Sequence, residues 1–306
     1  MTPVPPALAA PMTARQLAGA RRRQALAGFW RDFRGHRAGM AGLLVLAFIA
    51  LTALAAPVLT DETGLDVTQV HGRILADPSL EHLLGTDEKG RDVLLLTLWG
   101  ARISLLVGLT ATLLSVGIGA VVGVLAGHFR GRFGALLMWV TDWFLVLPSL
   151  VLAIALSTVL ERGLATIVLA IGITAWPTSA RLVRAQTLTV EARPYIERAK
   201  VLGGGHRHVM LRHVLPNVMP LVLANTTLTV ASAIISESTL SFLGLGDPTR
   251  VSWGSMLHSA FQSGAVTHGA WWYLLAPGLA ILVVVLGFTL CGRALEAVFN
   301  PRLRER

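Results

Sequence analysis

The stretch ISLLVGLTATLLSVGIGAVVGVLAG, residues 103–127, contains no ionisable side chain. An α-helix rises about 1.5 Å per residue, so a run of roughly 20 apolar residues crosses a hydrocarbon layer about 30 Å thick. Residues 38–60 form a second run of the same kind. The two runs predict two transmembrane helices, and they place the chain among integral membrane proteins.

The composition of the whole chain supports this class. Hydrophobic residues make up 54% and charged residues 14% of the 306 positions, whereas soluble domains have roughly 45–50% and about 25%. A water-soluble fold of this length would lack polar surface. Further apolar stretches predict four more spans, at residues 135–160, 164–180, 218–240 and 271–292. We therefore expect an all-α integral membrane protein with six transmembrane helices.

Two carboxylates lie inside these predicted spans, Asp142 in the third and Glu237 in the fifth. A carboxylate in the bilayer is costly unless neighbours satisfy it, so it marks either a functional path or a packing contact. We favour packing for Asp142 and keep both roles open for Glu237. Pro148 and Pro177 are expected to kink their helices or to mark helix boundaries. The aromatic residues Trp253, Trp271, Trp272 and Tyr273 are expected in an interfacial belt.

The net charge of +9 has a strongly uneven distribution. With six spans, 20 of the 26 Lys and Arg residues fall on the side of the N-terminus. By the positive-inside rule, both termini are predicted to be cytoplasmic in a multi-pass protein of the cell membrane. This placement favours contact with anionic lipid over nucleic-acid binding.

The predicted topology divides the chain into segments. The cytoplasmic parts are an arm at 1–37, a segment at 181–216 and a tail at 293–306. The spans at 38–60 and within the five-span core 103–292 are separated by an extracytoplasmic segment at 61–102. That segment contains eight acidic residues, and we expect it to present a solvated acidic face.

The cytoplasmic segment 181–216 is too polar to enter the bilayer. Pro194 suits the first position of a short helix, and the glycines at 203–205 are expected to end it. A second short piece, residues 206–215, is expected to stop at Pro216. Such an element can dock into a partner through Tyr195, Ile196, Ala199, Val201 and Leu202, rimmed by Glu197, Arg198 and Lys200. An amphipathic helix lying on the lipid surface is an equal alternative on physical grounds.

A resemblance separates these alternatives. Glu197-Arg198-Ala199, followed by Gly203 and by Leu215-Pro216, resembles the EAA loop of ABC-importer permeases, which couples to the nucleotide-binding subunit. Arg198 stands where that pattern prefers Ala, and His213 where Ile is frequent. The resemblance implies ATPase-coupling residues at Tyr195, Glu197, Ala199, Leu202, Gly203, Leu215 and Pro216.

Two other stretches narrow the family. GTDEKGRDV at residues 85–93, and SESTLSFLGLG at 236–246 with SWG at 252–254, resemble the dipeptide/oligopeptide/nickel group of these permeases. The arm followed directly by the first span is similar to the second, C-type subunit (DppC/OppC-like). The tail sequence Asn300-Pro301-Arg302-Leu303 differs from the expected Asp-Pro-Arg-Leu in its first residue.

Membership of this group implies a MetI-like fold and alternating access. It also implies a second permease subunit, two ATP-binding subunits that hold ATP and Mg²⁺, and an extracytoplasmic substrate-binding protein. The implied substrate is a di- or oligopeptide, with nickel or another small solute as the alternative. No cofactor is expected on this chain, and no catalysis, because it contains neither a P-loop nor a hydrolase motif.

Two competing hypotheses concern ions. An ion-driven secondary transporter would use Asp142 and Glu237 as coupling carboxylates, but the two halves of the chain show no internal repeat. A metal site at His206, His208 and His213 is disfavoured, because their spacing does not place them on one helical face.

Overall fold

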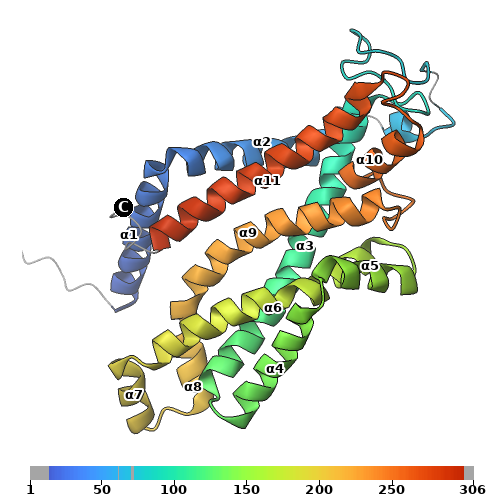
Figure 1. Cartoon of the computed structure of the whole chain (residues 1–306). Helices are drawn as coiled ribbons and strands as arrows, with labels where there is room; N and C mark the ends of the chain where they lie inside the picture. Colours follow the sequence, from blue (N-terminus) through green and yellow to red (C-terminus); the bar gives the residue numbers. More distant parts are fainter. Residues whose placement is uncertain (1–13, 61, 70–71, 300–306) are drawn as a thin grey trace, which may run out of the picture.

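A computed structural model of the chain describes residues 14–60, 62–69 and 72–299, and within these ranges the regular structure is helical. Figure 1 shows the arrangement. The tail motif at 300–303 and the first part of the N-terminal arm lie outside the described residues. The elements, in chain order, are α1 (Ala14–Gly35), α2 (Arg37–Leu59), the 3₁₀ turn η1 (Glu62–Leu65), α3 (Val93–His128), α4 (Arg132–Val146), α5 (Ser149–Val159), α6 (Leu164–Glu191), α7 (Pro194–Val201), α8 (His206–Val209), the π turn η2 (Met210–Val214), α9 (Leu215–Phe242), α10 (Trp253–Gln262) and α11 (Trp271–Phe299).

Five helices are long and apolar enough to cross a membrane, and the bent pair α4–α5 makes a sixth candidate. The packing of α3 against α6 decides how the pair is interpreted. A Cβ added at Gly119 would meet Ser179, and one at Gly127 would meet Thr187, so the two helices run in the same direction. The chain must therefore return across the bilayer between them, and α4–α5 is the segment that carries it. The fold thus contains the six expected spans.

Small residues make the close contact between α3 and α6 possible. Gly119, Gly123 and Gly127 lie four residues apart on one face of α3. A Cβ at Gly123 would lie 2.6 Å from the carbonyl oxygen of Ala180 and 2.7 Å from Cβ of Val183. Small residues at this spacing let membrane helices approach backbone to backbone. The α3–α6 pair is therefore the tightly packed centre of the bundle.

Several helices extend beyond the predicted spans. Helix α3 begins at Val93, so the last ten residues of the predicted outer segment 61–102 are helical, with Asp92 as the N-cap. Helix α6 continues through Pro177 to Glu191 and takes up the first part of segment 181–216. Charge ends the hydrocarbon-spanning part of a helix, but it does not end the helix, because the backbone hydrogen bonds continue into water.

The expected stop at Pro216 is wrong. Residues 206–242 form one continuous helical rod of 37 residues that includes α8, the π turn η2 and α9. A proline has no backbone N–H, so the usual bond to the fourth residue before it is lost. The π turn directly precedes the proline, and the side-chain amide of Asn217 donates to the carbonyl of His213 at 2.7 Å. These adjustments allow the helix to continue.

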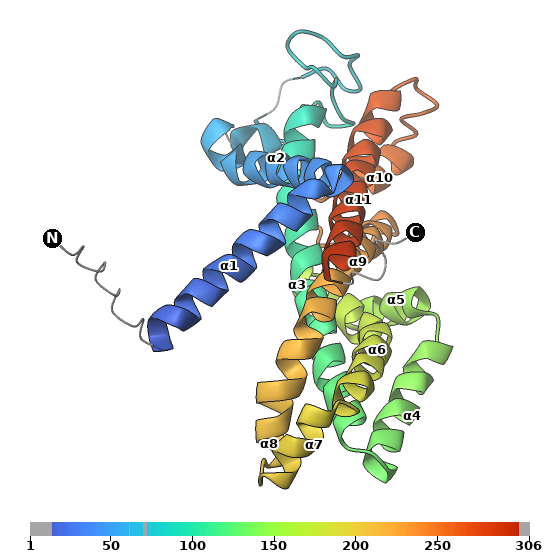
Figure 2. The same cartoon turned by 90° about the vertical axis from the view of Figure 1, so that its left-hand side faces the viewer.

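Pro148 breaks its span as expected. Helix α4 ends at Val146 and α5 begins at Ser149, and the two axes differ by 84°. Figure 2 shows α4 rising from the end of the molecule that holds α7 and α8, with α5 turned away from it.

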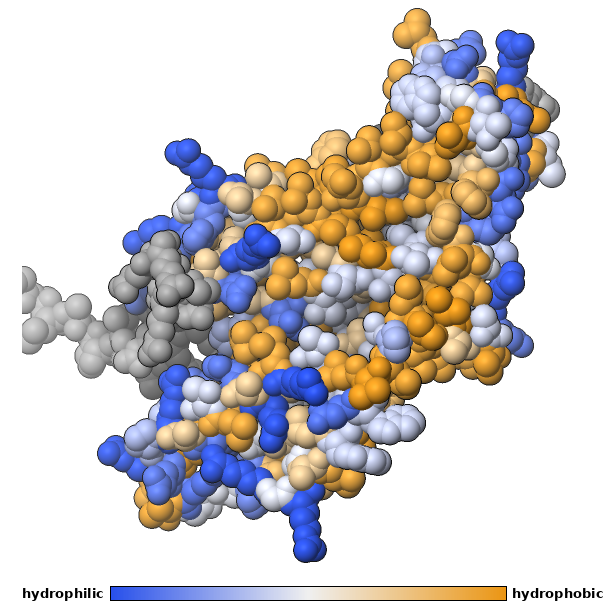
Figure 3. Space-filling view, viewed as in Figure 1, coloured by the Kyte–Doolittle hydropathy of each residue, from blue (hydrophilic) through white to orange (hydrophobic). Residues whose placement is uncertain are grey.

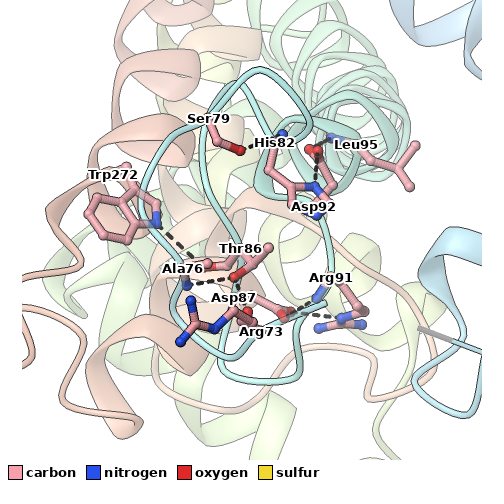
Figure 4. Close-up of polar contacts among 10 residues, drawn as sticks. All are labelled: Arg73, Ala76, Ser79, His82, Thr86, Asp87, Arg91, Asp92, Leu95 and Trp272. Atoms are coloured by element: carbon pink, nitrogen blue, oxygen red, sulfur yellow. Dashed lines mark hydrogen bonds and ion pairs between the residues drawn. The ribbon is translucent and has the colours of Figure 1, made fainter. Parts of the chain in front are cut away.

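The segment between α2 and α3 is a folded loop (Figure 4), and the expectation of a uniformly solvated acidic face is wrong for Asp87. Its side chain is fully buried and accepts hydrogen bonds from the backbone N–H groups of Lys89 and Arg91, both at 2.8 Å. Its second oxygen pairs with the Arg91 guanidinium at 2.7 Å. A buried carboxylate is tolerated here because both of its oxygens are satisfied.

The aromatic residues at this end also depart from expectation. Trp253, Trp272 and Tyr273 are buried, and Trp271 is exposed. The indole of Trp253 donates to the carbonyl of Thr97 at 2.9 Å, so its polar group has a protein partner instead of interfacial water. Only Trp271 has the exposure that an interfacial belt requires.

The surface matches a membrane protein whose ends lie in water. On the face seen in Figure 3, hydrophobic side chains predominate in the middle of the molecule, and hydrophilic ones gather toward its ends. One end carries α7, α8 and the α3–α4 link, and the other carries the folded loop and α10 (Figure 1).

Candidate functional site

Helix α7 has the boundaries that the sequence predicts. Pro194 occupies its first turn after the N-cap Arg193. At the other end the Gly204 N–H donates to the Ala199 carbonyl at 2.9 Å, and the Gly203 N–H donates to the Lys200 carbonyl at 3.0 Å. This pair of bonds is a Schellman motif, and it places Gly203 in the left-handed region at φ +87°.

The apolar side chains of α7 point in two directions. Ile196 is fully buried and packs in a cluster with valines of α6, α8 and α9. Val201 and Leu202 are 82% and 86% exposed, and Tyr195 is 37% exposed. Ile196 therefore holds α7 against the bundle, while the other three leave apolar surface uncovered. Exposed apolar side chains on such a short helix are typical of a docking site.

A hollow of about 610 Å³ lies between α7 and the start of α8. It is lined by four of the predicted coupling residues, Tyr195, Ala199, Leu202 and Gly203, together with Arg198, Gly204, Gly205, His208 and His213. Glu197 is exposed on α7 outside this lining. The remaining two, Leu215 and Pro216, lie at the start of α9; Leu215 packs beside the valine cluster and Pro216 is exposed.

A polar cluster with a buried centre, at the base of α7, was missed by the sequence analysis. His128 Nδ1 lies 2.6 Å from Glu191 Oε1, and Lys200 Nζ lies 2.6 Å from Glu191 Oε2. On its other side, His128 Nε2 lies 2.9 Å from His206 Nδ1. The only signal in the sequence is the position of each residue at a helix end. That signal does not reveal that His128 pairs with Glu191, 63 positions later, or with His206, 78 positions later.

Asp142 and Glu237 have different partners and different surroundings. Asp142 on α4 pairs with Arg181 on α6 at 2.7 Å, and both side chains are more than half exposed. Glu237 on α9 is 1% exposed and accepts from the hydroxyls of Ser104 and Ser241 at 3.0 and 2.8 Å. The structure does not bring the two carboxylates together.

A second cavity, of about 970 Å³, opens at the end opposite α7. It lies among α2, α3 and the α9–α10 loop, and Trp99, Arg102 and Asp247 are among its lining residues. The Asp247 carboxylate accepts from the Thr249 N–H at 2.8 Å. Burial acts to raise the pKa of Asp247, but the hydrogen bonds from Thr249, the Leu164 N–H and the charge of Arg250 together hold the pKa below its usual range. Neither Asp142 nor Glu237 lines this cavity.

Comparison with protein families gives a match over most of the chain. The family model described as the inner membrane component of binding-protein-dependent transport systems matches residues 119–305. The chain belongs to this family. A second model, the N-terminal TM domain of oligopeptide transport permease C, matches residues 25–78 of the permease. The chain is therefore a multi-pass membrane component of a transport system rather than an enzyme.

Relatives match the permease over nearly its whole length. It is 38% identical to the di/tripeptide transport system permease protein DppC of Pseudomonas aeruginosa, over 90% of this chain and 92% of that one. It is 36% identical to the oligopeptide transport system permease protein OppC of Bacillus subtilis, over 90% of each chain. The resemblance inferred from the sequence motifs is thus confirmed.

A solved structure confirms the fold class. A chain of the MetNI methionine ABC transporter in an inward-facing conformation matches with a TM-score of 0.54 at 20% identity. The match covers 66% of the permease and 96% of that chain. The predicted MetI-like fold is therefore confirmed. The remaining part of the permease has no counterpart in the matched chain.

Proposed function

We propose that this permease carries di- or oligopeptides across the membrane by alternating access, driven by separate ATPase subunits that dock on α7 and the adjoining hollow. The proposal rests on the observation that α7 has one buried apolar side chain and other apolar side chains that are exposed. Its Ile196 is fully buried, whereas Val201 and Leu202 are more than four-fifths exposed. A helix held on one side and uncovered on the other can receive a partner and transmit its movement.

The proposed orientation places α7 in the cytoplasm, together with both termini. Most of the basic residues belong to the arm, the α3–α4 link, segment 181–216 and the tail. Cytoplasmic segments of membrane proteins have an excess of Lys and Arg. ATP and Mg²⁺ would then be held by two ATP-binding subunits beneath the membrane, and this chain would hold no cofactor.

A second permease subunit is proposed to cover the face of α4. Trp139, Trp143 and Val146 are exposed on either side of Asp142, at helical spacing. The Asp142–Arg181 pair lies among them, more than half exposed. A charged pair is unfavourable against lipid tails, so this face suits contact with protein or with a water-filled path. A heterodimer with a similar subunit would satisfy this requirement.

The substrate class comes from the relatives, whose names specify di/tripeptide and oligopeptide transport. An extracytoplasmic binding protein would deliver the peptide, in keeping with the family description. Nickel or another small solute finds no support among the relatives named above. The structure gives no support to the ion-driven alternative, because both candidate coupling carboxylates already have protein partners. Asp142 is paired with Arg181, and Glu237 is bonded to serines.

The test is uptake of labelled di- and oligopeptides into proteoliposomes that contain the permease with its co-purifying subunits. The proposal expects uptake that needs ATP and binding protein, and an ATPase subunit that remains bound during purification. Replacing the exposed Leu202 by Asp should release the ATPase, while Leu80→Asp, a 99% exposed leucine at the opposite end, should not. Uptake that proceeds without ATP and follows an ion gradient would refute the proposal.

A further inference from the structure

Four helix ends meet at one polar cluster, which we call the base cluster: His128, Glu191, Lys200 and His206. His128 is the last residue of α3, and Glu191 is the last residue of α6. Lys200 lies in the last turn of α7, and His206 is the first residue of α8. The cluster therefore joins both halves of the α7–α8 element to the central α3–α6 pair.

The centre of the base cluster is closed to solvent. The side chains of His128 and Glu191 are 1% and 2% exposed, whereas that of Lys200 is 46% exposed. Each oxygen of the Glu191 carboxylate has a partner at 2.6 Å, His128 Nδ1 on one side and Lys200 Nζ on the other. Charge-assisted bonds in a buried site are short and strong, and leaving such a charge unpaired is costly.

The direction of the hydrogen bonds follows from the chemistry of the groups. A carboxylate next to a lysine ammonium can only accept, so His128 must carry its hydrogen on Nδ1. In a neutral His128, Nε2 is then the acceptor for the Nδ1–H of His206. With both ring nitrogens of His128 engaged, the bonds form one chain, from His206 through His128 and Glu191 to Lys200.

The covalent links alone would hold α7 loosely. Only Ala192 and Arg193 separate it from α6, and it is followed by three consecutive glycines before α8. Glycine-rich links bend easily. Helix α7 contacts the rest of the chain through the apolar packing of Ile196, the rings of Tyr195 and His213, and the Lys200–Glu191 ion pair. The ion pair is the charged contact among these, and it links the last turn of α7 directly to the end of α6.

We propose that the base cluster is a positioning device that makes α7 move together with α3 and α6. This inference rests on the proposed coupling role of α7 and adds to it the residues through which movement reaches the transmembrane core. Without the Lys200–Glu191 contact, α7 would still bind an ATPase, because Val201, Leu202 and the hollow do not depend on that contact. Its displacement would be taken up by the flexible links instead of by α3 and α6.

The test compares variants of Lys200 in the full importer, purified with its partner subunits and reconstituted in proteoliposomes. The quantity measured is the number of peptides taken up per ATP hydrolysed. Lys200→Met should lower this ratio at least about five-fold, the lower end of the usual range for coupling between sites. Lys200→Arg keeps a cation in reach of Glu191 and should retain the ratio. Arg130→Met, which removes an exposed cation at the same end of the molecule, is the matched control and should also retain it.

A double-mutant cycle provides the second measurement. If Lys200 acts through Glu191, Glu191→Gln should lower the same ratio, and adding Lys200→Met should change it little further. Should the buried Glu191→Gln variant fail to assemble, the Lys200→Met and Lys200→Arg pair decides alone. Lys200→Met takes the cation away from Glu191 Oε2, and Lys200→Arg, which restores a cation there, is the control for that loss.

The outcomes separate the two proposals. Suppose that the wild-type importer retains its ATPase and that its Lys200→Met variant takes up as many peptides per ATP as the wild type. This result would overturn the positioning role and leave the coupling role of α7 intact. Additive effects in the double-mutant cycle, or an Arg130→Met variant that loses coupling equally, would also overturn the positioning role. A wild-type complex that imports without ATP would instead overturn the proposed function.

Discussion

Asp142 and Arg181 form an ion pair between α4 and α6, with 2.7 Å between Asp142 Oδ1 and Arg181 Nη2, on a face that the isolated chain leaves uncovered. The two residues lie 39 positions apart, and most of their neighbours on α4 and α6 are apolar. A charged pair in such surroundings is favourable only where other protein or water covers it.

The first prediction concerns this pair. Asp142→Asn leaves Arg181 without its anion, so the amount of assembled importer and its peptide uptake should fall at least about five-fold, equivalent to roughly 1 kcal/mol. Exchanging the residues in an Asp142→Arg, Arg181→Asp double variant should recover part of the loss. Size-exclusion chromatography and uptake assays measure the effect, with the exposed Glu161→Gln as the control. Full uptake by Asp142→Asn would contradict a role for the pair.

The second prediction tests the α3–α6 contact. Gly123→Val would place Cβ 2.6 Å from a backbone carbonyl oxygen of α6, so α3 and α6 would have to move apart. Overpacking of this kind costs about 1–3 kcal/mol, so the thermal unfolding temperature in detergent should fall. Gly117→Val is the matched control on the same helix, because no neighbouring atom lies within 4 Å of its added Cβ. Equal unfolding temperatures for both variants would mean that the helices are not closely packed there.

The third prediction concerns the end of α7. At Gly203, φ is +87°, a conformation that costs an L-residue about 1–2 kcal/mol. Gly203→Ala should therefore loosen the turn and weaken retention of the ATPase subunit, whereas Gly203→Asn should be milder because asparagine tolerates this region. Gly28 lies in helix α1 without a positive φ and with open space around it, so Gly28→Ala should retain the ATPase. Co-purification yields measure the effect, and equal retention by all three variants would contradict it.

The fourth prediction separates packing from transport at Glu237. Three serines, Ser104, Ser238 and Ser241, donate to its carboxylate. Glu237→Gln keeps the size and an acceptor oxygen, so stability should fall by about 1 kcal/mol and uptake should stay within about two-fold. Glu237→Leu leaves three buried hydroxyls without their acceptor and should cost about 3 kcal/mol or more. Loss of uptake in a well-assembled Glu237→Gln importer would instead assign the charge to the transport path.

The features that the sequence predicted correctly depend on local chemistry. Uncharged runs such as 103–127 fix the presence of a span whatever its neighbours are. Pro194 and Gly203 delimit α7 because a missing N–H and a left-handed φ are properties of single residues. The same holds for the break at Pro148.

The features that it missed depend on contacts between distant residues. His128 and Glu191 look like ordinary polar residues at helix ends until the fold places them 2.6 Å apart. Asp87 looks like one of many solvated acids, and only its bonds from the Lys89 N–H and from Arg91 explain its burial. The parts of helices that extend beyond the membrane were also missed. Hydropathy indicates where the chain leaves the bilayer, but it does not indicate where the backbone hydrogen bonds of the helix stop.

The continuous helix from His206 to Phe242 has 37 residues. At about 1.5 Å per residue such a rod is roughly 55 Å long, well beyond the hydrocarbon thickness of about 30 Å. It begins at the base cluster and ends beside the serines that hold Glu237 and the start of α10. In the proposed alternating access, a tilt applied at its basic end would therefore reach the opposite surface through one continuous helix, and both ends of that helix would move together.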